Sequence, residues 1–152
     1  MRVLGIVLLG MIPLAVVVAD QLKPFTTDGC SVFPDGDLED NTKWMECCMR
    51  HDFAYWKGGT FDDRERADEG LKQCVSDLGE ENLSIVMHLG VRLGGSPFYP
   101  TGYRWGYGWP YLRGYEPLSS DERQQVVDRL GDVQALLAEF VVQMQSRPGP
   151  ER

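Results

Sequence analysis

Two adjacent cysteines, Cys47 and Cys48, constrain the fold of this chain more than any other feature of its sequence. Neighbouring cysteines cannot bridge each other without strain, so each needs a partner elsewhere. The remaining cysteines are Cys30 and Cys74. If all four are oxidised, the adjacent pair is tied to one region upstream and to one region downstream. The spacing leaves open which cysteine of the pair reaches which partner.

Residues 1–19 indicate a compartment in which these thiols oxidise. Arg2 is followed by an apolar run that ends in small residues at Ala19, which is typical of a cleaved secretory signal peptide. The run contains Pro13 and is shorter than the ~20 residues of a normal membrane span, although an uncleaved membrane anchor is the alternative. An even number of cysteines behind an export signal favours disulfides. We therefore expect a secreted or extracytoplasmic protein.

Residues 20–152 have the length of a single domain with one hydrophobic core. Without residues 1–19 the net charge is −9, because only one of the 15 basic residues lies there and none of the 23 acidic ones. A chain this acidic is a poor candidate for binding nucleic acid, which requires the neutralisation of phosphates. Excess carboxylate instead favours divalent cations as partners.

The spacing of apolar residues predicts an all-α fold that starts with a helix before a glycine turn. This first helix is expected to begin near Asp40 or Asn41, either of which can cap it, and to run to Trp56. The lysine and two glycines at residues 57–59 end it. Trp44 and Trp56 are expected in the core.

A second helix is predicted to follow the glycine turn. Thr60 or Asp62 can cap it, and its apolar stripe continues to Leu78. A tight turn between two helices makes an antiparallel hairpin. A disulfide from either cysteine of the adjacent pair to Cys74 would staple this hairpin.

The remainder of the chain contains a long loop and a last helix. The sequence leaves open whether the second helix continues past Gly79, which favours a break. Residues 94–117 are rich in glycine, proline and aromatic residues, and could form either a lipid-binding surface or a cover over the core. Ser119 and Glu122 form a capping box that predicts a C-terminal helix over residues 119–146.

His51 and Asp52 are the candidate functional residues of the first helix. Helical neighbours point about 100° apart, so both side chains can face one cleft. If a Cys47–Cys74 bridge fixes the register of the hairpin, Asp68 lies opposite His51. A histidine oriented by a carboxylate is a good general base, and Asp52 stays free to bind a metal.

Two further readings concern the histidines. A zinc site could be built from His51 together with Cys47, Cys48 and Cys74, but adjacent cysteines fit tetrahedral coordination badly. His88 lies in an apolar stretch and is expected to be a packed or surface histidine.

The motif C-C-x-x-H-D-x-x-Y, at residues 47–55, resembles the active-site helix of the secreted phospholipase A2 family. In that family the first cysteine of the pair bridges to the second helix, and a catalytic Asp stands six residues before that partner, which here is Asp68. The second cysteine bridges to a calcium-binding loop. The resemblance therefore implies two disulfides: Cys47–Cys74 and Cys30–Cys48.

The resemblance covers roughly residues 28–77 and extends to cysteines that this chain lacks. Many family members have a further disulfide between the positions that correspond to Ala54 and Ala67. Both halves of that bridge are absent together, while both halves of the other two bridges are present. Such matched loss is what divergence within a family predicts.

By this resemblance, the protein is expected to be a calcium-dependent hydrolase of the sn-2 ester of phospholipids, with a phospholipid or a membrane interface as its partner. His51 would activate the attacking water, and Asp68 would orient the imidazole. Tyr55 would form a hydrogen bond on the side of this pair away from the water. Asp52 would hold Ca²⁺ together with backbone carbonyls of the loop. These carbonyls would belong to Gly29, Ser31 and Phe33.

The loop around Cys30 departs from the pattern of the family. The family usually has glycines one and three residues after this cysteine, where this chain has Ser31 and Phe33. Glycines allow backbone carbonyls to converge on an ion. This loop could instead use carboxylates, from Asp28, Asp35 or Asp37. The departure favours the alternative function, a non-catalytic phospholipase A2-like module that binds lipid or protein.

Overall fold

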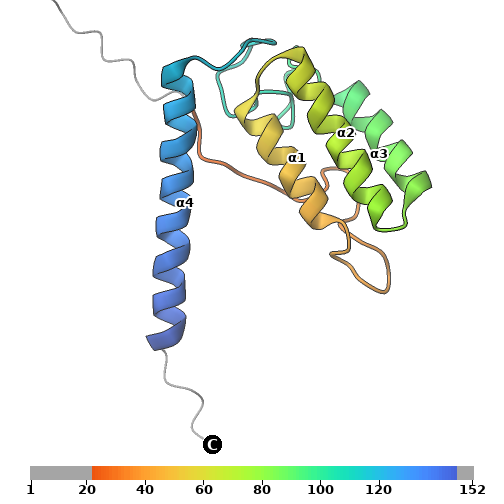
Figure 1. Ribbon diagram of the computed structural model, residues 1–152, viewed down its shortest axis with the longest axis horizontal. Coiled ribbons are helices and arrows are strands. Elements are labelled where there is room, and N and C mark those ends of the chain that lie inside the picture. The colour runs from red at the N-terminus through yellow and green to blue at the C-terminus, as the bar shows by residue number, and fades with distance from the viewer. Residues whose placement is uncertain (1–21, 147–152) are drawn as a thin grey trace, which may run out of the picture.

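The computed structural model describes residues 22–146, and this part of the chain is all-α, with four helices and no strand (Figure 1). The expectation of an all-α fold is therefore confirmed. The expected signal peptide, residues 1–19, lies outside the described residues. No helix in the described part of the chain combines the length and the apolar character needed to cross a membrane.

Helix α1, Met45–Lys57, begins later than the sequence predicted. Asp40 Oδ1 accepts hydrogen bonds from the backbone N–H of Thr42 at 2.9 Å and from its hydroxyl at 2.8 Å. This side-chain turn competes with helix formation, so the chain enters the helix only at Trp44, which takes the N-cap position. The start expected at Asp40 or Asn41 is wrong for this reason.

Helices α2, Phe61–Asp77, and α3, Glu81–Gly94, are separated by a glycine turn. Thr60 caps α2 as predicted: its hydroxyl oxygen accepts the N–H of Asp63 at 3.1 Å, and Asp63 Oδ2 accepts the N–H of Thr60 at 2.8 Å. Gly79 has φ +86°, which glycine adopts without steric cost. The second predicted helix therefore ends at this turn, and α3 is a separate element.

Packing and disulfides hold the first three helices together. α1 packs against α2, and α2 packs against α3. Two disulfides are present, with Cα–Cα distances of 5.7 Å for Cys47–Cys74 and 5.0 Å for Cys30–Cys48. This is the pairing that the resemblance implied. The bridges lie in a core whose other buried members are Trp44, Leu71, Val75 and Met87.

The aromatic and glycine-rich segment after α3, residues 95–119, covers the C-terminal end of α1. The N–H of Gly106 donates to the carbonyl of Tyr55 at 2.7 Å. The indole N–H of Trp109 donates to the carbonyl of Lys57 at 2.8 Å. A helix leaves its last carbonyls without partners inside the helix, so this segment supplies the hydrogen bonds that complete α1.

Tryptophans fill the space between this segment and α1. Trp56, Trp105 and Trp109 are 0%, 1% and 2% exposed. A Cβ at Gly108 would approach the Trp56 ring to 2.6 Å, so the segment comes this close only because glycine stands there. The expectation that Trp44 and Trp56 lie in the core is confirmed, since both are buried.

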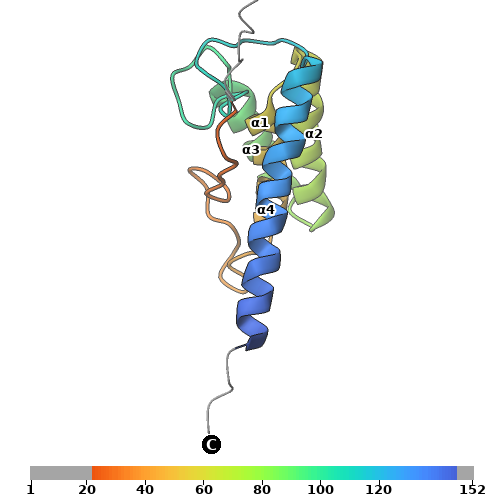
Figure 2. The ribbon, with the colours of Figure 1, turned by 90° about the vertical axis from the view of Figure 1, so that its left-hand side faces the viewer.

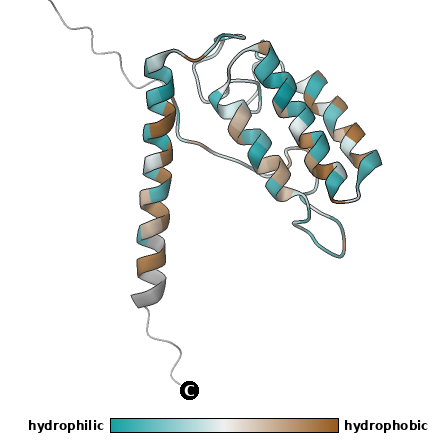
Figure 3. Ribbon diagram, viewed as in Figure 1, coloured by the Kyte–Doolittle hydropathy of each residue, from teal (hydrophilic) through white to brown (hydrophobic). Residues whose placement is uncertain are grey.

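Helix α4, Ser120–Ser146, begins at the predicted capping box. The hydroxyl oxygen of Ser119 accepts the N–H of Glu122 at 3.2 Å, and the Glu122 carboxylate accepts the N–H of Ser119 at 2.8 Å. Val126 packs against Leu22 near the start of the helix. Figures 1 and 2 show the C-terminal half of α4 extending beyond the body formed by α1, α2 and α3. Several turns of this half are coloured as hydrophobic in Figure 3. Its exposed apolar residues include Leu136, Leu137, Val141 and Val142.

Candidate functional site

Helix α1 presents three of the predicted site residues. His51 and Tyr55 lie one turn apart on its buried face, where they are 8% and 3% exposed. Asp52 lies beside them and is half-buried. One turn earlier, Cys47 and Cys48 tie α1 to α2 and to the preceding loop. The disulfides therefore fix where these three side chains stand relative to both neighbours.

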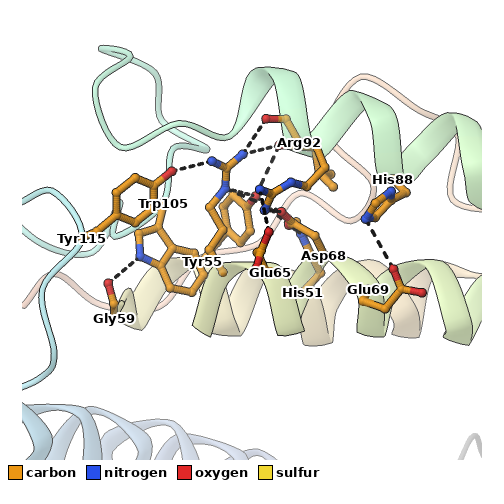
Figure 4. Close-up of polar contacts among 12 residues, drawn as sticks. His51, Tyr55, Gly59, Glu65, Asp68, Glu69, His88, Arg92, Trp105 and Tyr115 are labelled. Atoms are coloured by element: carbon orange, nitrogen blue, oxygen red, sulfur yellow. Dashed lines mark hydrogen bonds and ion pairs between the residues drawn. The ribbon is translucent and has the colours of Figure 1, made fainter. Parts of the chain in front are cut away.

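The imidazole of His51 faces Asp68 of α2 (Figure 4). His51 Nε2 lies 2.9 Å from Asp68 Oδ1, and the Tyr55 hydroxyl donates to the same oxygen at 2.7 Å. Burial opposes ionisation of Asp68, but hydrogen bonds from His51, Tyr55 and Arg92 outweigh it and hold its pKa below the usual value. Because the ionised carboxylate accepts, the neutral imidazole carries its hydrogen on Nε2. Its Nδ1 is then free to accept a proton.

Two arginines outside the family motif contact the other oxygen of Asp68. Arg92 of α3 donates to Asp68 Oδ2 at 2.9 Å, and Arg64 Nε lies 3.6 Å from the same atom. Arg64 Nε also donates to the Tyr55 hydroxyl at 3.0 Å. The spacing of four residues between Arg64 and Asp68 on a predicted helix is a signal that could have identified Arg64. No sequence signal points to Arg92.

Arg64 also connects this cluster to α3 and to the aromatic segment. It donates to the carbonyls of Val91 and Arg92, at 2.8 Å each, and to the Tyr115 hydroxyl at 2.6 Å. The guanidinium is buried, and the ionised Asp68 is the counter-charge beside it. Removing one member of a buried charge pair leaves the other uncompensated, so Asp68 and Arg64 depend on each other.

A cavity of about 250 Å³ opens beside His51 and Asp52. Helix α1, helix α3 and the loop before α1 form most of its walls, and α2 contributes only Leu71. The apolar residues of these walls include Val32, Phe33, Leu71, Met87, Val91 and Tyr103. Polar groups that converge on one end of a mostly apolar cavity are the usual composition of a small-molecule site.

Asp52 has the electrostatic character of a cation ligand. Its carboxylate accepts a hydrogen bond from the Thr27 hydroxyl at 2.7 Å. Burial raises the pKa of Asp52 to about 6, against the lowering effect of Thr27 and His51, and the nearby charge of Asp28 adds to the rise. Among the described residues, no lysine or arginine forms an ion pair with this carboxylate. A bound cation would compensate its charge.

The backbone of the loop lies next to Asp52. Gly29, Ser31 and Phe33 line the same cavity as Asp52. Gly29 has φ +77°, and Val32 has φ +69°, which is a strained conformation for a β-branched residue. Over residues 22–146, no group of three or more acidic, histidine or cysteine side chains is arranged to hold a metal. A cation at Asp52 would therefore take most of its ligands from carbonyls and water.

The three alternative carboxylates of the loop differ in their surroundings. Asp35 accepts a backbone N–H within the loop at 2.7 Å, and Asp37 pairs with Lys43 at 3.2 Å. These two side chains organise the loop itself. Asp28 lines a second cleft together with Asp52, so it is the alternative ligand that stands beside the predicted one.

The structure tests two further predictions, a zinc site that includes His51 and a packed or surface position for His88. The zinc site that combined three cysteines with His51 is wrong, because all four cysteines form disulfides. His88 is partly exposed and lies 3.6 Å from Glu69 (Figure 4). It is a surface histidine, as expected.

The aromatic segment both covers the core and exposes aromatic rings. Its tryptophans are buried over α1, whereas Phe98, Tyr99 and Tyr111 are about half-exposed. Tyr103 is 46% exposed and also lines the cavity beside His51. This segment therefore covers the core and also exposes aromatic rings that could form a lipid-binding surface.

No protein-family model, curated protein or solved structure matches this chain.

Proposed function

We propose that the protein is a secreted, calcium-dependent hydrolase of the sn-2 ester of phospholipids, as the resemblance of residues 47–55 to secreted phospholipase A2 implies. One observation carries the proposal: the 2.9 Å contact between His51 and Asp68 lies at a mostly apolar cavity that Asp52 also lines. A base, an anionic cation ligand and an apolar compartment are the parts that this reaction needs.

In the proposed reaction, His51 activates water. Nδ1 of His51 accepts a proton while the water oxygen bonds to the carbonyl carbon of the ester. The proton then passes to the sn-2 alkoxide as the C–O bond breaks, so a fatty acid and a lysophospholipid are released. Asp68 holds the ring through Nε2 and offsets the positive charge that develops on it. Tyr55 and Arg92 hold Asp68 in its ionised form.

Calcium is proposed to bind at Asp52, with further ligands from the loop before α1. Because the pKa of Asp52 is raised to about 6 by burial, a cation that compensates its charge fits this position. The remaining oxygens are assigned to backbone carbonyls, those of Gly29, Ser31 and Phe33, and to Asp28. Bound calcium would polarise the ester carbonyl and stabilise the oxyanion. A calcium-type loop would then precede the antiparallel, disulfide-stapled helix pair, as in the family.

A lipid surface fits the apolar side chains exposed around the cavity. Val32, which lines the cavity, is 93% exposed. Leu89 and Leu93, which directly precede the cavity-lining Gly90 and Gly94, are 56% and 75% exposed. Such side chains are suited to the boundary between headgroups and acyl chains. The two disulfides are compatible with the extracytoplasmic location in which such a substrate would be met.

The proposal is tested by measuring fatty-acid release from phosphatidylcholine vesicles with calcium and with a chelator. We expect release that stops when calcium is removed. His51→Gln is expected to lower the rate by about 10²–10⁴-fold, because it removes the base. The matched control is His88→Gln, which changes the other histidine of the chain and is expected to leave the rate unchanged.

The alternative function gives a different result in the same assay. A non-catalytic module, which the divergent loop favours, would bind the vesicles without calcium and release no fatty acid. Release that is insensitive to His51→Gln would refute the assignment of the base.

A further inference from the structure

We infer that Gly90 and Gly94 of α3 set the length of acyl chain that the cavity accepts, by leaving the cavity wall without side chains at these two positions. This inference rests on the proposed function, because it concerns the same cavity. It adds a specificity determinant that lies outside the motif at residues 47–55.

One face of α3 forms a wall of the cavity. Met87, Gly90, Val91 and Gly94 all line the cavity, and their spacing of three and four residues places them on one side of the helix. Met87 and Val91 supply apolar side chains to this wall. At the two glycines the wall consists of helix backbone alone.

The space beside these glycines is open. A Cβ built on Gly90 or on Gly94 meets no heavy atom within 4 Å, other than atoms of its own stretch of helix. The next glycine is different, since a Cβ on Gly95 would collide with the hydroxyl and ring of Tyr55. Close packing against Tyr55 therefore explains why glycine stands at position 95, whereas no neighbouring side chain requires glycine at positions 90 and 94.

A glycine inside a helix weakens the helix, because it increases the conformational freedom of the unfolded chain. Two such positions one turn apart, both facing a cavity, keep volume available at the expense of helix stability. An acyl chain that runs along this wall would occupy that volume. A side chain at either position would shorten the space that remains for the chain.

The expected effect follows from the burial of methylene groups. Each methylene that loses its place in the cavity lowers affinity about fourfold. A leucine side chain in place of a glycine hydrogen would exclude about three methylenes, so affinity for a long chain should fall about fiftyfold. A chain short enough to end before the glycines should bind about as well as before.

The test measures binding of octanoate, dodecanoate and palmitate to the oxidised full-length protein by calorimetry. Gly90→Leu and Gly94→Leu are expected to weaken palmitate binding about fiftyfold and to change octanoate binding less than about threefold. Gly70→Leu is the matched control. Gly70 is also a helical glycine with open space at its Cβ, but it lies on α2 outside the cavity lining. The Gly70→Leu variant is expected to bind all three fatty acids with the same affinity as the unsubstituted protein.

Four results would overturn the inference: unchanged palmitate binding in both cavity variants, an equal loss for octanoate and palmitate, the same loss in Gly70→Leu, or no fatty-acid binding by the unsubstituted protein. Because binding needs no catalysis, the outcome is separate from that of the proposed function. One outcome separates the two proposals. If the leucine variants bind only shorter fatty acids than the unsubstituted protein does, and no fatty acid is released from vesicles, the hydrolase is refuted and the assignment of the two glycines is supported.

Discussion

Tyr55→Phe removes one hydroxyl from the cluster around Asp68 and leaves the ring in place. The hydroxyl donates to Asp68 Oδ1 at 2.7 Å and accepts from Arg64 Nε at 3.0 Å. Both partners are buried. The substitution therefore takes one hydrogen bond from a buried carboxylate and one acceptor from a buried guanidinium.

The magnitude follows from these two losses. A hydrogen bond to a charged group contributes about 1.5–3 kcal/mol. The loss at Arg64 is smaller, because its Nε lies 3.6 Å from Asp68 Oδ2 and can move toward it. The free energy of unfolding should fall by about 3 kcal/mol in all. For a domain of this size that corresponds to a decrease in Tm of roughly 10 °C.

The pH dependence of this stability has a defined sign. Folding lowers the pKa of Asp68, so its contribution is present above the unfolded value near 3.8 and is lost as the pH falls through the folded value. Tyr55→Phe removes one of the hydrogen bonds that lower this pKa. Acid unfolding of the variant should therefore begin at a higher pH than in the unsubstituted protein.

Thermal and acid unfolding followed by circular dichroism measure both effects. Tyr99→Phe is the control, since Tyr99 is about half-exposed. A decrease in Tm for Tyr55→Phe no larger than that of the control would refute the role assigned to this hydroxyl. An unchanged acid midpoint would refute its effect on Asp68.

Two further predictions concern Asp52 and Arg92. Because protons compete with calcium for Asp52, whose pKa is about 6, apparent calcium affinity measured by calorimetry should fall about tenfold per pH unit below that value; an affinity independent of pH would contradict Asp52 as a ligand. Asp52→Asn should bind no calcium, yet unfold at a higher temperature than the metal-free protein at neutral pH, because folding disfavours the ionised form. Arg92→Gln should lower the unfolding free energy by about 2 kcal/mol and raise the pH of acid unfolding, since it removes a charged donor from Asp68. Arg92→Lys should recover part of both effects in denaturant and acid titrations, and equal losses in the two variants would argue against a role for the charge.

The sequence predicts best the features that depend on neighbouring residues. The capping box at Ser119 and a cap at Thr60, one of two residues considered there, were predictable because the partners of each lie within four residues. The start of α1 was not, because Asp40 can either cap a helix or close a turn, and its bonds to Thr42 select the turn. Propensity alone does not distinguish these two outcomes.

The site was predictable as far as the motif extends. His51, Tyr55 and Asp68 come from one short pattern and one helix register. Arg92 approaches Asp68 only because α3 packs against α2, and no periodicity of the sequence encodes that contact. The hydrogen bonds from residues 105–109 to the end of α1 could not be predicted either, because that segment has no regular sequence pattern.

The bonds between residues 105–109 and α1 affect the order in which the molecule folds. The bond from Trp109 to Lys57 joins residues 52 positions apart, whereas Cys47 and Cys74 are separated by 27. Closing a longer stretch of chain loses more entropy, so we expect the distant contact to form later. We therefore expect the last turn of α1 to remain frayed during folding until after α1 and α2 have met. Tyr55, whose carbonyl accepts the N–H of Gly106, should become rigid only when the second half of the chain has packed against α1.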